Sequence, residues 1–409
     1  MIRTRVGLTA LSLSTNIITF ISYTQLLRHM GASAELDRLF YAASFPMAIA
    51  GVTSGVLLYI LPTRFNLITP KAQESTLRVL FIIFSIICLI AILLITTYGQ
   101  FKRELVLAIL WAGFTLLALV QVLNTLQVCI AQARGIYLIT GAAGMIYSVG
   151  LLAGSTTAVY THTVLWILIG QLFGALVAAI CLARFLGLKS SWNRNDLLIA
   201  KESLFPLKSH AFQIIAGTMA FTLFQPIDAV LCTMLSGGSI SVMSYVQRVA
   251  VAVGTAVSFG SYTIASRTSH ESLSNGGQYS LLRLANKEVR QIVILGLVAW
   301  ASFALGGKII FRDIFVSHDL SGRDLDRLVE CLEWILLGVG PMSAIPYLFR
   351  VFYVKQNYFK PAIVGIAIPP VYGILALIMI PRFDILALAY AYSVVWWLAL
   401  LTLLFWIND

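Results

Sequence analysis

The chain alternates along its whole length between long apolar stretches and short polar ones. A helix of about 20 apolar residues is long enough to cross the hydrocarbon core of a bilayer, so each stretch is read as a membrane span. The pattern predicts twelve spans, at residues 7–28, 39–61, 78–98, 105–132, 137–159, 163–185, 210–235, 239–265, 290–311, 329–351, 361–381 and 385–407.

Composition supports the same class. Of the 409 residues, 59% are hydrophobic and 11% are charged, which lies outside the range of soluble domains. The sequence therefore predicts an all-α polytopic membrane protein. The formal net charge of +11 comes from basic residues scattered over short loops, which suits an anionic membrane surface and not nucleic acid.

The sequence carries no motif that indicates an enzyme. The GGKII stretch at 306–310 lacks the upstream glycine and the Ser or Thr of a phosphate-binding P-loop. The five cysteines show no CxxC spacing, and the five histidines show no pairing at metal-ligand spacing. We therefore expect a protein that is not an enzyme and that binds neither a metal nor a cofactor.

The loops between the spans predict the topology. An even number of spans puts both termini on one side, and about two thirds of the Lys and Arg residues fall there, so we expect cytoplasmic termini and a cytoplasmic (inner) membrane. The long loop at 186–209 predicts two six-helix lobes, 1–186 and 210–409, with a cytoplasmic linker at 187–209. A second long loop, 268–289, predicts a basic amphipathic helix on the inner membrane surface.

A weak internal repeat supports the two-lobed arrangement. A shift of 203 residues aligns GVTSGVLLYILPTR with GTAVSFGSYTIASR. Three positions are then identical: Gly51 with Gly254, Tyr59 with Tyr262, and Arg64 with Arg267. Many transporters consist of two such repeats and bind their substrate between them.

One arginine, Arg248, lies in an otherwise apolar run that is rich in Gly, Ala, Ser and Thr. A charge at the centre of a span costs about 2.5–3.5 kcal/mol, so it usually faces a cavity or a partner. Two interpretations stay open: Arg248 pairs with a helix carbonyl or an acid, or it lines a path for an anion. We favour the second because small neighbouring residues leave room for a ligand.

Asp228, in FTLFQPIDAVL, is the only acid well inside a predicted span. Pro226 precedes it, removes a helix hydrogen bond and frees a backbone carbonyl nearby. An acid beside a free carbonyl is a candidate site for a coupling cation, either Na⁺ or H⁺. The alternative is a structural ion pair with Arg248 in the neighbouring span.

A third polar group lies at the outer turn between the first two spans. It contains Arg28, Asp37 and Arg38, and Pro46 is expected to bend the second span just inward of it. Asp37 is expected either to cap the following helix or pair with Arg38, or else to shape the outer gate of a cavity. Arg28 and Asp37 are therefore candidate substrate-binding residues together with Arg248.

Three stretches carry a resemblance to a known family. LLRHMGASAELDRLFYAASFP, GGSISVMSYVQRVAVAVGTAV and VFYVKQNYFKPAIV resemble the first-to-second span, the eighth span and the loop before the eleventh span of the MurJ/MviN-type lipid II flippases. Those proteins belong to the multidrug/oligosaccharidyl-lipid/polysaccharide exporter superfamily. The resemblance implies two six-helix lobes around a central cavity that opens to each side of the membrane in turn.

The resemblance also implies a function, a flippase for a polyprenyl-pyrophosphate-linked glycan, either lipid II-like or a polysaccharide repeat unit. Three cavity arginines typical of the family correspond to Asn16, Ser22 and Ala50 here, which favours a glycan carrier other than lipid II itself. Membrane lipids and glycan-assembly enzymes are the expected partners. The alternatives are a cation-coupled multidrug or small-solute antiporter of the same superfamily, and a non-transporting scaffold for glycan assembly.

Overall fold

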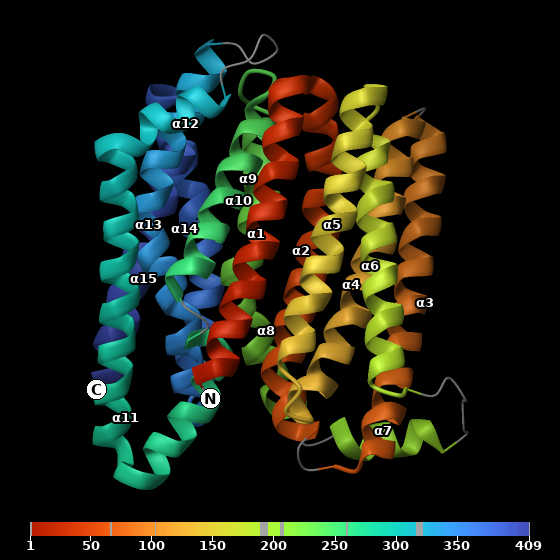
Figure 1. Ribbon diagram of the computed structural model, residues 1–409, viewed down its shortest axis with the longest axis vertical. Helices are drawn as coiled ribbons and strands as arrows, with labels where there is room; N and C mark the ends of the chain where they lie inside the picture. Colours follow the sequence, from red (N-terminus) through yellow and green to blue (C-terminus); the bar gives the residue numbers. More distant parts are fainter. Residues whose placement is uncertain are drawn as a thin grey trace.

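The computed structural model describes residues 2–65, 68–102, 104–188, 195–204, 208–258, 261–315 and 322–408. Every regular element in these ranges is a helix, which confirms the predicted all-α class (Figure 1). The elements are α1 (Ile2–Met30), α2 (Ala34–Phe65), α3 (Pro70–Lys102), α4 (Leu105–Ala133), α5 (Leu138–Thr161), α6 (Leu165–Phe185), α7 (Asp196–Leu204), α8 (Lys208–Thr222), α9 (Phe224–Cys232), α10 (Ser239–Ser258), α11 (Ser261–Ser302), the π-helical turn η2 (Phe303–Gly307), α12 (Lys308–Phe315), α13 (Gly322–Val354), α14 (Phe359–Phe383) and α15 (Leu386–Asn408).

The membrane spans follow the predicted pattern. Within the described ranges, ten helices are long and apolar enough to cross a bilayer, and the bent pair α8 and α9 makes an eleventh. Helix α1, which contains the first predicted span, 7–28, is not among these eleven. It has the length of a span at 29 residues but is less apolar than α2, α4 and α5. Its polar residues, among them Asn16 and Thr19, line an internal cavity instead of facing lipid.

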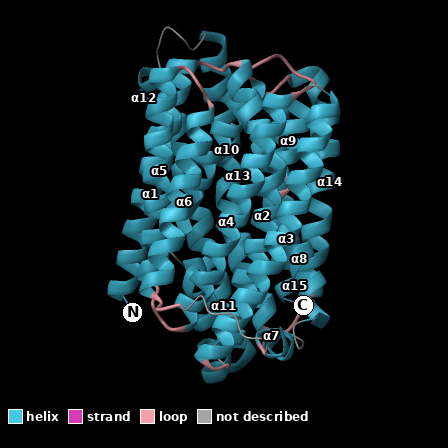
Figure 2. Ribbon diagram, turned by 90° about the vertical axis from the view of Figure 1, so that its right-hand side faces the viewer, coloured by secondary structure: helices cyan, strands magenta, loops and turns pink. Residues whose placement is uncertain are grey.

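Helices α1 to α6 pack mainly on one another, and so do α8 to α15; these two groups, which lie side by side, are called the first and the second lobe below (Figure 1). The predicted linker at 187–209 connects α6 to α8, and within it α7 packs against α3. Both chain ends lie at the same end of the bundle (Figures 1 and 2). On the outside, α3 exposes Ile86, Leu89 and Leu94, as expected of a surface in contact with lipid.

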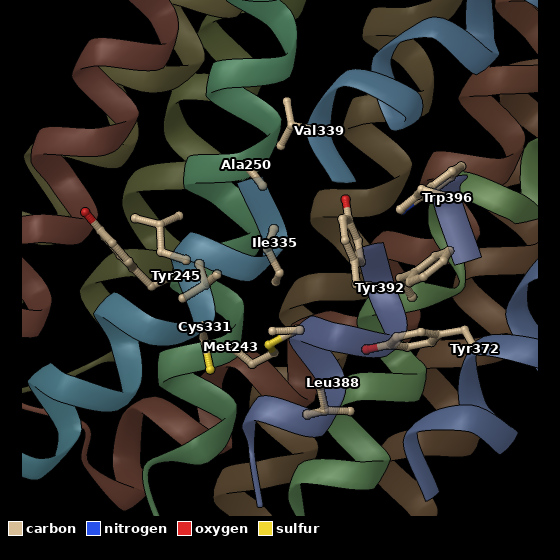
Figure 3. Packing of buried hydrophobic residues seen from close by; sticks show 14 of the residues in the cluster. Met243, Tyr245, Ala250, Cys331, Ile335, Val339, Tyr372, Leu388, Tyr392 and Trp396 are labelled. Carbon is tan, nitrogen blue, oxygen red and sulfur yellow. The ribbon is translucent and has the colours of Figure 1, made fainter. Parts of the chain in front are cut away.

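The core of the second lobe is built around α13. This helix packs on α10 and α15, and its residues Ile335 and Val339 belong to the same buried cluster as Ala250 of α10, beside which Val339 lies (Figure 3). Trp396 of α15 stacks on the ring of Phe224, with 5.2 Å between centroids. The aromatic contact joins α9 to α15, and the packing of α13 on α10 and α15 completes a group of helices that supplies most of one wall of the cavity described below.

Glycines let α5 and α6 approach closely. A Cβ atom added at Gly150 would lie 2.5 Å from the carbonyl oxygen of Gly170, and one added at Gly154 would lie 2.9 Å from the Gly170 Cα. Gly170 and Gly174 are spaced four residues apart on α6, like their partners on α5. Such small-residue pairs are the usual way for membrane helices to pack backbone against backbone.

The prediction that the 268–289 loop forms a helix on the membrane surface is wrong. Helix α11 runs through this region and bends at Gly277, which has a positive φ of 66°. Beyond the bend, Leu281 and Ala285 are fully buried, and α11 packs on α13. The apolar face of this amphipathic segment is therefore covered by protein and not by a membrane surface.

Candidate functional site

A cavity of about 840 Å³ lies between the two lobes. Its wall comes from α1, α2 and α5 of the first lobe and from α8, α9, α10, α13 and α15 of the second. The lining includes Thr140 and Gly141 in the first turn of α5, and α5 begins at the end of the bundle that carries both chain termini (Figure 1). Gly51 and Gly254, paired in the sequence repeat, both line the cavity. The side chains of the other repeat positions, Tyr59, Arg64, Tyr262 and Arg267, lie outside the described residues.

Arg248 lines this cavity from the middle of α10. Its guanidinium carbon lies 4.0 Å from the centroid of the Tyr23 ring and 5.5 Å from that of Phe40. Its Nε has no hydrogen-bond partner among the described residues. Aromatic faces therefore position the cation by cation–π attraction, which leaves its charge uncompensated by any described carboxylate.

Asp228 is buried in α9 and does not pair with Arg248. Its Oδ2 accepts a hydrogen bond from the Gln247 side-chain amide, and its Oδ1 accepts one from the Tyr372 hydroxyl. The chain bends by 43° between α8 and α9, three residues ahead of Pro226, so the expected break in the span is present. Gln247 also lines the cavity and so connects the buried acid to the cavity wall.

Asp37 joins the two lobes at the end of the bundle away from the chain termini. Its Oδ2 accepts the Gly238 N–H at 2.7 Å, and its Oδ1 accepts both the N–H and the hydroxyl of Ser241, at 2.8 and 2.6 Å. A carboxylate is stabilised at a helix N-terminus by unpaired N–H groups and by the helix dipole. The start of its own helix is capped by Ser33, whose hydroxyl accepts the Leu36 N–H at 3.4 Å.

This end of the bundle is closed by further contacts between the lobes. The hydroxyls of Thr24 in α1 and Tyr245 in α10 are hydrogen-bonded at 3.1 Å. A Cβ at Gly238 would lie 2.5 Å from the carbonyl oxygen of Ala32, so the segment before α10 touches the turn between α1 and α2 there. The geometry of Asp37 therefore fits the gate interpretation. Arg28 is exposed in the last turn of α1 and lies outside the cavity lining.

The positions that replace family arginines differ in their surroundings. Asn16 lines the cavity, and its Nδ2 has no partner among the described residues. Ser22 is buried and donates to the Ile18 carbonyl at 2.8 Å, and Ala50 is buried. The other polar side chains of the described lining are uncharged and include Ser12, Thr19, Tyr23, Thr140, Thr218, Thr222, Gln225, Tyr245, Gln247, Thr255, Ser258, Ser343 and Tyr392.

Sequence reasoning missed Gln247, Tyr372 and Tyr23, which hold the two charged residues in place. Gln247 precedes Arg248 and is a polar side chain inside an apolar helix, which is a signal that could have been used. In the part of the chain that the structure describes, no three His, Cys, Asp or Glu side chains gather as a metal site requires.

The fold and the cavity define a class: a multi-pass helical membrane transporter with two lobes and a central chamber closed at one end. A family model described as lipid II flippase MurJ matches residues 28–408. The chain therefore belongs to the MurJ lipid II flippase family, as its three sequence stretches predicted. A comparison with curated proteins finds no match to the chain.

Solved structures show the same fold. A lipid II flippase MurJ in an inward closed conformation is 15% identical, with a TM-score of 0.79 over 99% of this chain and 88% of that chain. A multidrug resistance MATE family transporter of the MOP superfamily, facing inward, is 12% identical with a TM-score of 0.70 over 98% and 97%. A MOP superfamily transporter from Pyrococcus furiosus is 14% identical with a TM-score of 0.69 over 99% and 94%.

Proposed function

We propose that this protein flips a polyprenyl-pyrophosphate-linked glycan across the cytoplasmic membrane by alternating access. The observation that carries the proposal is Arg248, a cation held in a cavity of about 840 Å³ without a described acid to neutralise it. Membership of a flippase family supports the same substrate class. Glycan-assembly enzymes are the partners that would supply and consume such a substrate.

Arg248 would hold the pyrophosphate. A guanidinium presents a planar fork that can bind two phosphate oxygens at once, whereas a lysine offers a point charge. Charge-assisted hydrogen bonds of this kind contribute about 1.5–3 kcal/mol each. The Tyr23 ring, 4.0 Å away, lies against the guanidinium and fixes its position for the incoming anion.

The charge bias of the loops supports an orientation with both termini in the cytoplasm. In that orientation the cavity faces the cytoplasm, where lipid-linked glycans are made, and Asp37 closes the opposite end. Export then requires a second state in which the hydrogen bonds from Gly238 and Ser241 to Asp37 are broken. Two states of similar free energy, biased by the bound substrate, suffice for this cycle.

Asp228 would couple transport to protons. Both of its oxygens accept hydrogen bonds from N–H or O–H donors, Gln247 and Tyr372. Donor hydrogens cannot ligate Na⁺, which needs oxygen lone pairs around it, so a proton suits this site better. Because Gln247 also lines the cavity, protonation of Asp228 would change the hydrogen bonding that the substrate meets.

Replacing Arg248 tests the proposal. In proteoliposomes, Arg248→Ala should reduce flipping of a polyprenyl-pyrophosphate glycan by at least about tenfold, the effect of losing one bond of about 1.4 kcal/mol or more. Arg248→Lys should retain part of the activity because the charge remains. Arg28→Ala, at an exposed position outside the cavity, is the matched control and should leave flipping unchanged. Full flipping by a normally abundant Arg248→Ala protein would exclude Arg248 as the pyrophosphate ligand.

A cation-coupled antiporter is the second candidate function. The MATE-like fold and the buried Asp228 favour it. The cavity opposes it, because Arg248 is the charged residue of the described lining and repels the cations that multidrug antiporters commonly export. The scaffold alternative gains no support from a fold that encloses a chamber of this size.

A further inference from the structure

The N-terminus of α10 is held from two sides. From the first lobe, Asp37 accepts hydrogen bonds from the N–H groups of Gly238 and Ser241. From the second lobe, Arg327 of α13 donates a hydrogen bond from its Nη1 to the Ser236 hydroxyl at 2.7 Å. Ser236 lies two residues before Gly238, so both contacts act on the same turn between α9 and α10.

This turn, residues 236–239, is held together by its own hydrogen bonds. The N–H and the hydroxyl of Ser239 both donate to the Ser236 carbonyl, at 3.3 and 2.7 Å. Gly238 has a φ of 86°, a left-handed conformation that favours glycine, and its backbone lies against Ala32 of the first lobe. Because the turn is bonded internally, a residue that holds Ser236 also sets the direction of the Gly238 N–H.

Arg327 is itself held by two carboxylates. Its Nη2 donates a hydrogen bond to Asp384 Oδ2, and its Nη1 lies 3.9 Å from Asp324 Oδ1. A planar guanidinium can bind the Ser236 hydroxyl and the Asp384 carboxylate at once, whereas a lysine would offer a single point charge. Only 13% of the Arg327 side chain is exposed, so these contacts are screened less than those of an ion pair on the open surface.

The backbone of Asp384 is an independent observation. This residue ends α14 with a φ of 52° and a ψ of −137°, a conformation that aspartate adopts rarely and glycine adopts readily. Such conformations persist where the surrounding structure supports them, and they gather at ligand clamps and switch regions. The carboxylate that a glycine would lack is the group that binds Arg327. A strained aspartate therefore stands where its side chain can hold the arginine.

We propose that Arg327 is a positioning residue for the end of the bundle that Asp37 closes. Through Ser236 it fixes the 236–239 turn to the second lobe, so that the N–H groups at the start of α10 face Asp37. Without Arg327 the turn can tilt, the hydrogen bonds to Asp37 weaken, and this end opens more often. The inference rests on the alternating access of the proposed function and holds for any cargo.

Labelling from outside intact cells tests the proposal. The parent is the full-length chain with its native cysteines replaced and Thr222→Cys placed in the cavity lining, and the probe is a membrane-impermeant maleimide. Arg327→Ala should speed labelling by about two- to fivefold, the effect of losing a partly exposed charged contact. Arg327→Lys should label at an intermediate rate, because it keeps the charge without the planar fork. Arg312→Ala is the matched control and should label like the parent, because Arg312 pairs with Asp326 on the same end of the bundle (Figure 1).

A double variant separates positioning from general stability. In Asp37→Ala the turn has no carboxylate to face, so adding Arg327→Ala should not raise the labelling rate further. If Arg327 only stabilised the second lobe, the two changes would act independently and their effects on the rate would multiply. Multiplied rates, or a parental rate in a normally abundant Arg327→Ala protein, would overturn the inference.

Asp384→Gly is the second variant, for use if Arg327→Ala does not accumulate. It removes the carboxylate that holds Arg327 and relieves the backbone strain, so it should fold, and it should label faster than the parent. A parental rate in Asp384→Gly beside faster labelling in Asp37→Ala would overturn this inference alone. Parental rates in both would also overturn the role of Asp37 in closing that end. Because labelling requires no cargo, its outcome is separate from that of the Arg248 variants, on which the proposed function depends.

Discussion

Arg248 combines two properties that rarely occur together. It is placed by aromatic faces, at 4.0 Å from Tyr23 and 5.5 Å from Phe40, and it keeps its full charge because no described carboxylate pairs with it. A cation held by an acid would be fixed but neutralised, and the substrate would have to break an ion pair before binding. The aromatic support avoids that competition.

Asp228 gives the residue-scale prediction. Asp228→Asn keeps the shape of the side chain but removes the titratable proton. The variant should therefore insert and accumulate, while flipping loses its dependence on a pH gradient imposed across the proteoliposome. Asp313→Asn, at an exposed position of α12, is the control and should retain that dependence. A pH-gradient response that persists unchanged in Asp228→Asn would rule out this acid as the coupling site.

The charged residues of the site could be recognised in the sequence, and their aromatic partners could not. Arg248 and Asp228 are conspicuous because a charge inside an apolar stretch is costly and rare. Tyr372 looks like any aromatic residue in a span, and it lies 144 positions from the acid that it binds. Aromatic partners of this kind carry no sequence signal, because the fold alone decides which of the many aromatic residues in the spans meet the charged ones.

At the scale of elements, helix contacts depend on small side chains. The α5 and α6 backbones meet at Gly150 and Gly170, so the first lobe has no room for a side chain at this crossing. Large apolar residues at these positions would hold the two helices apart. They would gain little from facing another helix, because lipid chains offer them an equally apolar surrounding.

Gly150→Ala tests this contact. The added Cβ would lie 2.5 Å from a backbone oxygen, so the helices must move apart, and overpacking of this kind costs about 1–3 kcal/mol. The midpoint of thermal unfolding in detergent should fall. Gly237→Ala is the control, because nothing lies within 4 Å of a Cβ at that position, and its midpoint should stay within error of the parent. Equal midpoints for both variants would contradict the close crossing.

The positions of the spans could be predicted from the apolar pattern, and the role of the 268–289 segment could not. Its leucines and basic residues form the pattern of a surface helix. The structure buries Leu281 and Ala285 completely instead, because they lie just beyond the kink at Gly277 and α11 packs on α13. An amphipathic pattern shows that one face is apolar but not whether lipid or protein covers it.

At the scale of the whole molecule, the two lobes are joined at one end and parted by the cavity toward the other. The joined end includes a carboxylate from one lobe at the helix N-terminus of the other, Asp37 with Gly238 and Ser241. The two-lobed plan was foreseen from the repeat and from the family resemblance. The end at which the lobes meet could not be read from the sequence, since it depends on which conformation is the more stable.

Asp37→Ala should loosen the joined end. With the native cysteines replaced and Thr222→Cys placed in the cavity lining, a membrane-impermeant maleimide added outside intact cells should label the parent slowly. In the Asp37→Ala background, labelling should become several times faster because the far end opens more often. Arg38→Ala, an exposed neighbour, should label like the parent. If Asp37→Ala also does so, these hydrogen bonds do not keep that end shut.

The single cation of the described cavity lining also makes the transport cycle respond to the membrane voltage. With Asp228 neutral, the described lining of the empty chamber carries one positive charge, and the same lining with a bound pyrophosphate carries one negative charge. A cell interior held at negative voltage pushes the loaded chamber outward and draws the empty one back inward. Each elementary charge that crosses the full field is worth about 2.3 kcal/mol per 100 mV, so the resting voltage favours both half-cycles in the direction of export.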